Sequence, residues 1–134
     1  MFKYQRRVHV YETDLMGIVH HSNYLRLCEE ARVEWCTQNA LIDASDKAVF
    51  GLAVTETRVK HVSPARYADL LTVSTQVRTE GVRMFFQYKI TSAERVVCLA
   101  ETVHCSLDLN FKVKRLNADI IKSVEKEIWT ETWL

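Results

Sequence analysis

The sequence predicts an α+β fold in which one long helix packs against an antiparallel sheet. One stretch, residues 23–38, repeats its apolar residues with the period of a helix. Four later stretches alternate apolar and polar residues and are rich in β-branched side chains, which is typical of half-buried strands. Short turns between successive strands indicate antiparallel pairing, and a helix with a single apolar stripe covers one face of such a sheet.

The first strand is expected over Phe2–Tyr11, with Val8 and Val10 on one face. The helix follows over Asn23–Gln38, with Ser22 as its expected N-cap, because the hydroxyl can accept from an N–H of the first turn. Its apolar stripe consists of Tyr24, Cys28, Ala31 and Trp35, with Leu27 beside it. Glu30 and Glu34 lie off this stripe. A catalytic role for them is one alternative, but their position favours a solvated face.

Four strands are expected after the helix, and their apolar residues occupy alternate positions. Their ranges are Leu52–Val62, Leu70–Arg78, Arg83–Thr91 and Val96–Leu109. In the third strand the apolar face is formed by Met84, Phe86, Tyr88 and Ile90. In the last strand the same rule selects Val97, Leu99, Val103, Cys105, Leu107 and Leu109. A short helix is expected over Ile120–Ile128.

Length and composition limit the classes to which the chain can belong. One domain is expected over residues 1–134, and its 48% hydrophobic and 26% charged residues are typical of a globular protein. The 18 basic and 17 acidic residues leave a charge of +1, which disfavours a nucleic-acid or anionic-membrane partner. No apolar run approaches the ~20 residues of a membrane span, and no signal-peptide core follows the first charges. A cytoplasmic location is therefore expected.

The cysteines and histidines suggest no metal centre. Four cysteines, Cys28, Cys36, Cys98 and Cys105, form no C-x-x-C pair and have a spacing unlike that of a zinc site. Two disulfides are one alternative, but we interpret these residues as buried reduced thiols. His20 and His21 are adjacent, and adjacent side chains rarely reach one ion.

The segment from Tyr11 to Tyr24 breaks every period and places Asp14 just ahead of the helix start. The first turn of a helix presents unpaired N–H groups and a partial positive charge. An amide there can polarise a carbonyl oxygen, while a nearby carboxylate attacks the carbonyl carbon or activates a water. The segment therefore suggests acyl chemistry. The alternative is that Asp14 only caps a turn or the helix.

The order of residues in this segment is similar to a family signature, T-D-x-x-G-[VI]-V-x-H-x-x-Y. The matching residues are Thr13-Asp14, Gly17-Ile18-Val19, His21 and Tyr24, followed by Ala31-Arg32 in the helix. Weaker matches include Ser63-Pro64-Ala65-Arg66-Tyr67 and Phe86-Gln87, so the likeness covers nearly the whole chain. The chain resembles the hotdog-fold thioesterases of the 4-hydroxybenzoyl-CoA thioesterase family. The nearer likeness is to a branch of bacterial acyl-CoA thioesterases encoded with the Tol-Pal system.

This resemblance implies a hotdog fold, in which a curved antiparallel sheet wraps around one long helix. It also implies a homodimer or homotetramer with interface active sites that hydrolyse acyl-CoA, or acyl carrier protein thioesters, without cofactor or metal. By motif position, Asp14 is the catalytic carboxylate, as nucleophile or general base, and His21 carries the amide that polarises the carbonyl. Gly17 lets the loop pass close to the substrate, and Arg83 meets a CoA phosphate. His20 replaces a family aromatic residue and is expected beside the substrate.

Two other functions remain open for such a chain. A hotdog dehydratase would need a histidine acting with a carboxylate and is normally marked by other motifs. A non-catalytic protein that binds acyl-CoA or a partner would not need Asp14, Gly17 and His21 together. The side chain of His21 also has two interpretations: it orients water or the leaving thiolate, or it packs on Tyr24 and caps the helix.

Overall fold

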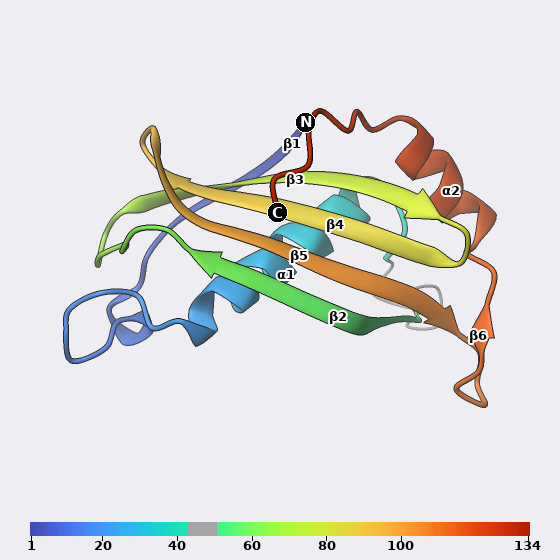
Figure 1. The fold of residues 1–134 in the computed structure, drawn as a ribbon, viewed down its shortest axis with the longest axis horizontal. Coiled ribbons are helices and arrows are strands. Elements are labelled where there is room, and N and C mark those ends of the chain that lie inside the picture. Colours follow the sequence, from blue (N-terminus) through green and yellow to red (C-terminus); the bar gives the residue numbers. More distant parts are fainter. Residues whose placement is uncertain (43–50) are drawn as a thin grey trace.

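The computed structural model describes residues 1–42 and 51–134, and its elements follow the predicted order (Figure 1). They are β1 (Phe2–Arg7), η1 (Val10–Glu12), α1 (Ser22–Gln38), β2 (Leu52–His61), β3 (Leu70–Glu80), β4 (Arg83–Ser92), β5 (Arg95–Leu107), β6 (Val113–Lys114) and α2 (Ala118–Glu125). Within the described ranges, no helix has the length and apolar character needed to cross a membrane.

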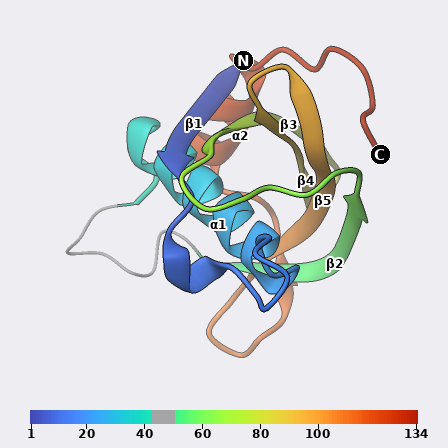
Figure 2. The ribbon, with the colours of Figure 1, turned by 90° about the vertical axis from the view of Figure 1, so that its left-hand side faces the viewer.

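The strands form one antiparallel sheet in the order β1-β3-β4-β5-β2, and β6 pairs with the end of β5. The sheet curves around α1, which lies inside the curve (Figure 2). This arrangement confirms the predicted class, a curved antiparallel sheet wrapped around one long helix. In the part of the chain that the structure describes, β1 and β2 are the edges of the sheet.

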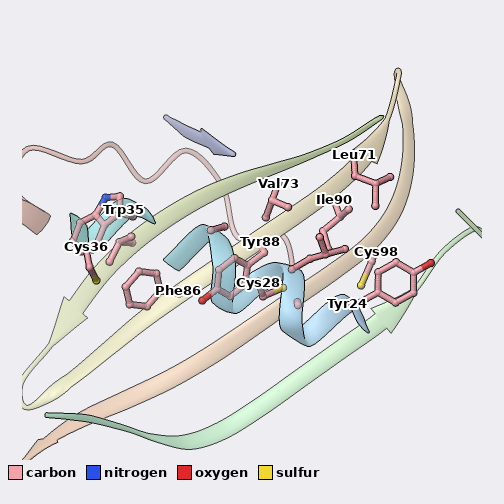
Figure 3. Close-up of a cluster of buried hydrophobic side chains, with 14 of the residues drawn as sticks. Tyr24, Cys28, Trp35, Cys36, Leu71, Val73, Phe86, Tyr88, Ile90 and Cys98 are labelled. Atoms are coloured by element: carbon pink, nitrogen blue, oxygen red, sulfur yellow. The ribbon is translucent and has the colours of Figure 1, made fainter. Parts of the chain in front are cut away.

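The core lies between the inner face of the sheet and α1 (Figure 3). Period-two alternation points Met84, Phe86, Tyr88 and Ile90 of β4 inward, and all four are fully buried, as predicted. The helix contributes Trp35, whose ring meets Phe86 edge-on with 5.5 Å between centroids. Burying a large apolar side chain stabilises the fold by about 1.5–3 kcal/mol, so this layer holds the helix against the sheet.

The four cysteines are buried free thiols. Cys28, Cys36 and Cys98 belong to the core cluster. Burial raises the pKa of the Cys36 and Cys98 thiols to about 12. These side chains are protonated at neutral pH and serve as small apolar groups, as the sequence predicted.

The predicted end of the first strand is wrong. β1 ends at Arg7, earlier than expected, and η1 follows it. The N–H of His9 donates to the Glu12 carboxylate at 2.8 Å and so holds this turn. Val8 is buried but Val10 is 67% exposed, so the two do not share an inner face.

The predicted inner face of the last strand is also wrong. β5 pairs Val96 with Thr91 and Cys98 with Ile90, so Val97 is an extra residue that forms a β-bulge. After the bulge, Cys98, Ala100, Thr102 and His104 lie opposite the inward residues of β4 and face the helix. A shift of one residue moves every later side chain to the other face of a strand, so Leu99, Val103 and Cys105 face outward.

The last helix lies close to its predicted position but is shifted. α2 spans Ala118–Glu125 rather than Ile120–Ile128. Its start is set by the side chain of Asn117, which accepts a hydrogen bond from the N–H of Asp119 at 2.7 Å. The chain that follows α2 crosses the outer face of the sheet (Figure 1).

Candidate active site

The loop between η1 and α1 forms a tight turn that presents Asp14. The N–H of Asp14 donates to the Ile18 carbonyl at 2.9 Å, and the N–H of Gly17 donates to the Asp14 carbonyl at 3.0 Å. Gly17 has a φ of +76°, a left-handed conformation that glycine adopts without strain. The carboxylate Oδ1 of Asp14 accepts from the N–H of Met16 at 2.8 Å. These bonds fix the direction of the carboxylate from within the loop.

The loop is also attached to the segment that follows β2. The N–H of Val19 donates to the Ala65 carbonyl at 2.8 Å, and Ile18 forms an isolated antiparallel bridge with Arg66. A second bridge, between Thr13 and Val19, closes the base of the loop. The loop therefore lies against the end of β2, a contact between segments that are far apart in the sequence.

A cavity of about 400 Å³ lies where the loop, α1 and the end of β2 meet. Its walls are formed by Asp14, Ile18, Val19, His21, Tyr24, His61, Val62, Ser63 and Pro64. The structure thus brings Asp14 and His21 together, as the sequence motif suggested. Burial raises the pKa of Tyr24, so its hydroxyl is protonated at neutral pH.

The start of α1 borders this cavity through His21. Ser22, the predicted N-cap, is instead the first residue of the helix, and no side-chain bond caps the helix from His21. The ring of His20 replaces the predicted cap: its Nδ1 accepts from the N–H of Ser22 at 3.2 Å and lies 2.8 Å from the Ser22 Oγ. Within the described part of the chain, the amide of His21 bonds to no backbone acceptor. That amide is the group that the motif assigns to the carbonyl oxygen.

Three imidazole rings surround the helix start. The rings of His20 and His21 lie 4.2 Å apart, and His61 at the end of β2 lies 6.4 Å from His21 and 5.4 Å from Tyr24, all between centroids. His61 lines the cavity, whereas His20 does not. The sequence reasoning missed His61, because only the long-range contact of the loop with the end of β2 brings it to Asp14.

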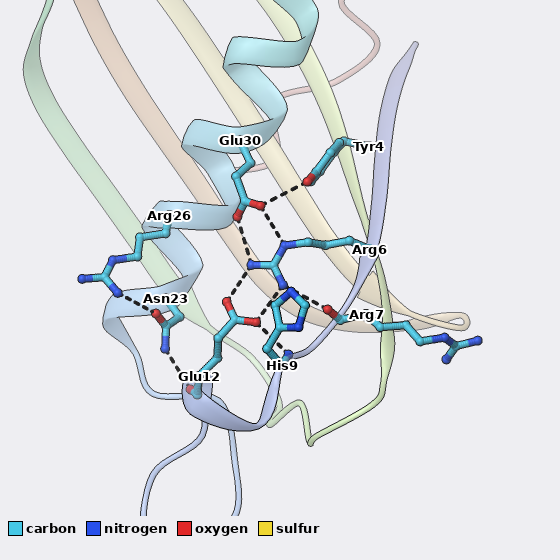
Figure 4. A network of polar contacts seen from close by, with 8 residues as sticks. All are labelled: Tyr4, Arg6, Arg7, His9, Glu12, Asn23, Arg26 and Glu30. Atoms are coloured by element: carbon cyan, nitrogen blue, oxygen red, sulfur yellow. Dashed lines mark hydrogen bonds and ion pairs between the residues drawn. The ribbon is translucent and has the colours of Figure 1, made fainter.

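A partly buried ion cluster supports the loop from the other side (Figure 4). The guanidinium of Arg6 bonds both oxygens of Glu12, at 2.7 and 2.6 Å, and both oxygens of Glu30, at 2.7 and 3.0 Å. The hydroxyl of Tyr4 also donates to Glu30, at 3.1 Å. Hydrogen bonding to Arg6 lowers the pKa of Glu12, and bonding to Glu12 and Glu30 raises the pKa of Arg6. The expectation that Glu30 is merely solvated is therefore wrong.

The backbone of Glu12 connects this cluster to the helix start. Its carbonyl accepts from the N–H of His20 at 2.9 Å and from the side-chain amide of Asn23 at 2.8 Å. Asn23 lies in the first turn of α1 and is buried. Glu12 is thus fastened to β1 and α1 through Arg6 and to the first helical turn through Asn23. These bonds fix the loop that carries Asp14 relative to the helix start.

Arg83, the predicted phosphate contact, is not brought to this cavity within one chain. It begins β4 at the opposite end of the sheet from the Asp14 loop (Figure 1). There its guanidinium lies 3.6 Å from the Glu80 carboxylate and 5.1 Å from the Phe85 ring centroid. Across the described ranges, the cavity included, no group of three His, Cys, Asp or Glu side chains is placed to hold a metal ion.

Comparison with known proteins gives consistent results. The family model of the thioesterase-like superfamily matches residues 8–125. A putative esterase from Aquifex aeolicus is 33% identical over 124 residues, which cover 90% of this chain and 95% of that protein. An acyl-CoA thioester hydrolase (YbgC) from Escherichia coli is 29% identical over 103 residues, which cover 72% of this chain and 74% of that protein.

Solved structures show the same fold. A 1,4-dihydroxy-2-naphthoyl-CoA thioesterase from Synechocystis matches with a TM-score of 0.86 at 23% identity, covering 93% of this chain and 96% of that one. The curved antiparallel sheet around one long helix is the hotdog fold. The chain belongs to the thioesterase-like superfamily, a family of thioester hydrolases.

Proposed function

We propose that the chain hydrolyses acyl-CoA thioesters in the cavity that Asp14 and His21 line. The observation that carries this proposal is the meeting of a loop carboxylate and the first turn of α1 in one cavity. The acyl-CoA specificity in the name of the Escherichia coli relative supports this substrate class. Acyl carrier protein thioesters contain the same reacting group and are the second substrate class to test. The predicted cytoplasmic location belongs to the same proposal.

In the proposed reaction, the thioester carbonyl oxygen faces the amide of His21. The positive end of α1 stabilises the negative charge that develops on this oxygen. Asp14 then acts in one of two ways: its carboxylate attacks the carbonyl carbon, or it removes a proton from the attacking water. In both cases the C–S bond breaks, the thiolate leaves and takes up a proton, and water supplies the new oxygen of the free acid.

The walls of the cavity suit an acyl group next to a charged catalytic residue. Ile18, Val19, Val62 and Pro64 supply apolar surface beside the Asp14 carboxylate. Apolar walls exclude bulk water, which strengthens the interaction between the helix start and the developing oxyanion. These residues, together with His61, are the positions at which we expect acyl specificity to be set.

We also propose a dimer in which two copies join through their β2 edges. Among residues 1–42 and 51–134, β2 has no neighbour on one side, and its inward residues Val54 and His61 remain exposed where β2 borders α1. An edge strand presents unpaired N–H and C=O groups, and pairing with the same strand of a second copy satisfies them. The cavity lined by His61 then lies at the subunit interface. Light scattering should show at least a dimer at micromolar concentration, and a monomer would contradict this model.

An assay with a thiol-trapping reagent and a panel of acyl-CoA and acyl carrier protein thioesters tests the proposed activity. Release of free thiol with formation of the acid is the expected result. Hydration of an enoyl thioester without thiol release would indicate a dehydratase. Saturable binding of acyl-CoA with neither reaction would indicate a non-catalytic binding protein. Either of the last two results would overturn the proposal.

A further inference from the structure

A row of polar side chains crosses the outer face of the sheet at one level. Gln76 of β3 lies opposite Gln87 of β4, which lies opposite Glu101 of β5, which in turn lies opposite Arg58 of β2. Gln76 donates to Gln87 at 3.1 Å, and Gln87 donates to Glu101 at 2.7 Å. Arg58 donates to the other oxygen of Glu101 at 2.7 Å. We call these four residues the outer row.

Both glutamines of the outer row are fully buried, although they face away from the core. The cover is the segment 126–134, which we call the tail; it leaves α2 and passes outside the sheet (Figures 1 and 2). Gln76 bonds the backbone of the tail with both ends of its amide. Its Oε1 accepts from the N–H of Thr130 at 3.1 Å, and its Nε2 donates to the Glu131 carbonyl at 2.6 Å.

Gln87 contacts the tail in the same way. Its Oε1 accepts from the N–H of Trp133 at 2.9 Å, and its Nε2 donates to the Leu134 carbonyl at 3.2 Å. The guanidinium of Arg58 donates to the same carbonyl at 3.2 Å. A glutamine side chain offers one N–H donor and one C=O acceptor to the tail. The backbone of a neighbouring strand would offer the same two groups. The outer row therefore recognises extended backbone, independently of side-chain identity.

Side-chain selectivity comes from two cations that flank the row. The guanidinium of Arg78 lies 5.1 Å from the ring of Trp129 and also stacks on Phe85. The ammonium of Lys89 lies 4.7 Å from the ring of Trp133. Cations at these distances attract the faces of aromatic rings. The pair of cations thus favours aromatic residues four positions apart.

We propose that the outer row and its two flanking cations form a peptide-binding site, separate from the thioester cavity, with the tail as its ligand. The tail contributes no strand to the sheet. Near its start, the Glu127 carboxylate accepts from Nε1 of Trp35 in α1 at 2.8 Å. From Thr130 to Leu134, strand side chains bond its backbone, which is how a bound peptide is held. α1 and the cavity lie on the opposite face of the sheet. A detached tail leaves a site that fits the same segment of a second copy, since every copy carries these two tryptophans.

The test uses the chain of 134 residues with Thr130→Pro and Trp133→Pro. Proline removes the two N–H groups that Gln76 and Gln87 accept, so the variant's own tail should leave the site. A fluorescent peptide with the sequence of residues 126–134 should then bind saturably, one per chain, in an anisotropy titration. The wild-type chain should bind it at least about tenfold more weakly, because its tethered tail competes at high effective concentration.

The outer row is tested by adding Gln76→Leu and Gln87→Leu to the proline variant. Because each substitution leaves polar groups unpaired, binding of the peptide should weaken at least about tenfold. A matched control is Gln5→Leu on β1, which should leave binding unchanged. Among the described residues, the side chain of Gln5 bonds the hydroxyl of Thr72 on β3, at 2.8 Å, and no residue of the tail. Replacing both tryptophans of the peptide by alanine should also weaken binding.

Two results would overturn the proposal: a folded proline variant, shown by circular dichroism, that does not bind the peptide, or binding that is unaffected by the glutamine substitutions. If the proline variant does not fold, amide hydrogen exchange of the wild-type chain tests the proposal instead. The amides of Thr130 and Trp133 should exchange more slowly than in the free peptide, and Gln76→Leu should abolish the protection at Thr130. Exchange at the rate of the free peptide in the wild-type chain would contradict the proposal.

Discussion

At the end of the sheet that carries Asp14, the guanidinium of Arg6 is enclosed between two carboxylates, and its side chain is only 18% exposed. At the opposite end, Arg83 and Glu80 lie 3.6 Å apart with side chains that are 48% and 61% exposed. The residue types are the same, but solvent screens the second pair, and exposed pairs contribute only about 0–1 kcal/mol. Enclosed charges can therefore hold a loop in place, whereas exposed charges remain available for another molecule.

The two ends of the sheet differ in how the backbone is held in place. The loop at the Asp14 end lacks regular secondary structure, so a few side-chain bonds must replace the hydrogen bonds of a helix or strand. Glu12 provides them through its carboxylate to Arg6 and through its carbonyl to Asn23. At the Arg83 end, Arg83 and Glu80 pair directly across the turn between β3 and β4, and the sheet itself fixes the backbone.

The largest effect is expected from Asp14→Asn, because asparagine is neither a base nor an effective nucleophile. The value of kcat should fall about 10²–10⁴-fold, the usual contribution of a positioned base, or more if the mechanism is covalent. Asparagine keeps the side-chain oxygen that accepts from Met16, so the melting temperature should not change. Thioester kinetics, melting curves and binding of a thioether analogue measure these effects. Wild-type turnover with a lowered melting temperature would show that Asp14 is only a turn residue.

Arg6→Met tests the enclosed cluster. It leaves the carboxylates of Glu12 and Glu30 close together without their shared cation. Because the cluster is only partly buried, the free energy of unfolding should fall by about 1–3 kcal/mol, less than for a fully buried pair. Urea denaturation should show this loss of unfolding free energy. Arg7→Met is the matched control on the same strand. Arg7 is exposed, and within the described ranges its side chain donates to one group, the Ala68 carbonyl, at 2.9 Å. Equal losses for the two variants would contradict the distinction between enclosed and exposed charges.

The regular elements were largely predictable from the sequence, and the failures have specific causes. Alternation identified the inner face of β4 because Met84, Phe86, Tyr88 and Ile90 contact one continuous core. The same rule failed on β5, because a bulge at Val97 reverses the later faces and the sequence carries no local mark of it. Val103 is nevertheless only 2% exposed, although it faces outward. Alternating apolar residues thus mark positions that are buried. They do not identify the inner face of β5, because residues on both faces of this strand are buried.

The candidate site was predictable where its residues are contiguous and not where they are distant in sequence. Asp14 and His21 line the cavity and belong to one motif, and Gly17 between them supplies the left-handed turn of the loop. His61 enters the cavity only because the loop pairs with the segment after β2, a contact without a local signal. Glu30 was misjudged because its partner Arg6 comes from β1, and helical periodicity does not report such pairing.

His104 gives the Arg83 end a buried titratable group and a predicted pH dependence. It faces α1, it is 1% exposed, and its Nε2 lies 2.8 Å from the Thr102 hydroxyl. Burial lowers its pKa to about 3, below about 6.5 in the unfolded chain. Between these two pKa values, His104 binds a proton in the unfolded chain but not in the folded one. Its contribution to the free energy of unfolding is therefore fully present above pH 6.5 and is lost as the pH decreases. The contribution is about 1.4 kcal/mol per pH unit.

Urea denaturation at pH 7, 6 and 5 measures this slope. The wild-type chain should lose about 2 kcal/mol of unfolding free energy from pH 7 to pH 5 through His104 alone. His104→Gln retains a polar group near Thr102 but does not titrate, so its slope should be clearly smaller. Parallel slopes for the two chains would show that His104 is not the group responsible.

Arg83→Ala has the smallest expected effect and links the two ends. In an antiparallel dimer joined through the β2 edges, the Arg83 end of one copy lies beside the Asp14 end of the other. We therefore propose that the contact with a CoA phosphate, predicted from the motif, is made across the proposed dimer. A phosphate contact stabilises the bound substrate and the transition state by the same free energy. Its loss should therefore raise KM while kcat stays the same. The rise in KM should correspond to a loss of about 1–2 kcal/mol of substrate-binding free energy, the range for a hydrogen bond to a charged group reduced by solvent exposure.

An acyl-pantetheine substrate provides the control for Arg83→Ala, because it lacks the phosphates of CoA. Its kinetic constants should be the same for the variant and the wild-type chain. Unfolding free energy should also change little, since the pair that Arg83 forms with Glu80 is exposed. If both substrates lose activity equally, Arg83 acts on the fold and not on the phosphate. If the activity on neither substrate is affected, Arg83 does not contact CoA, and the phosphates of CoA are bound elsewhere.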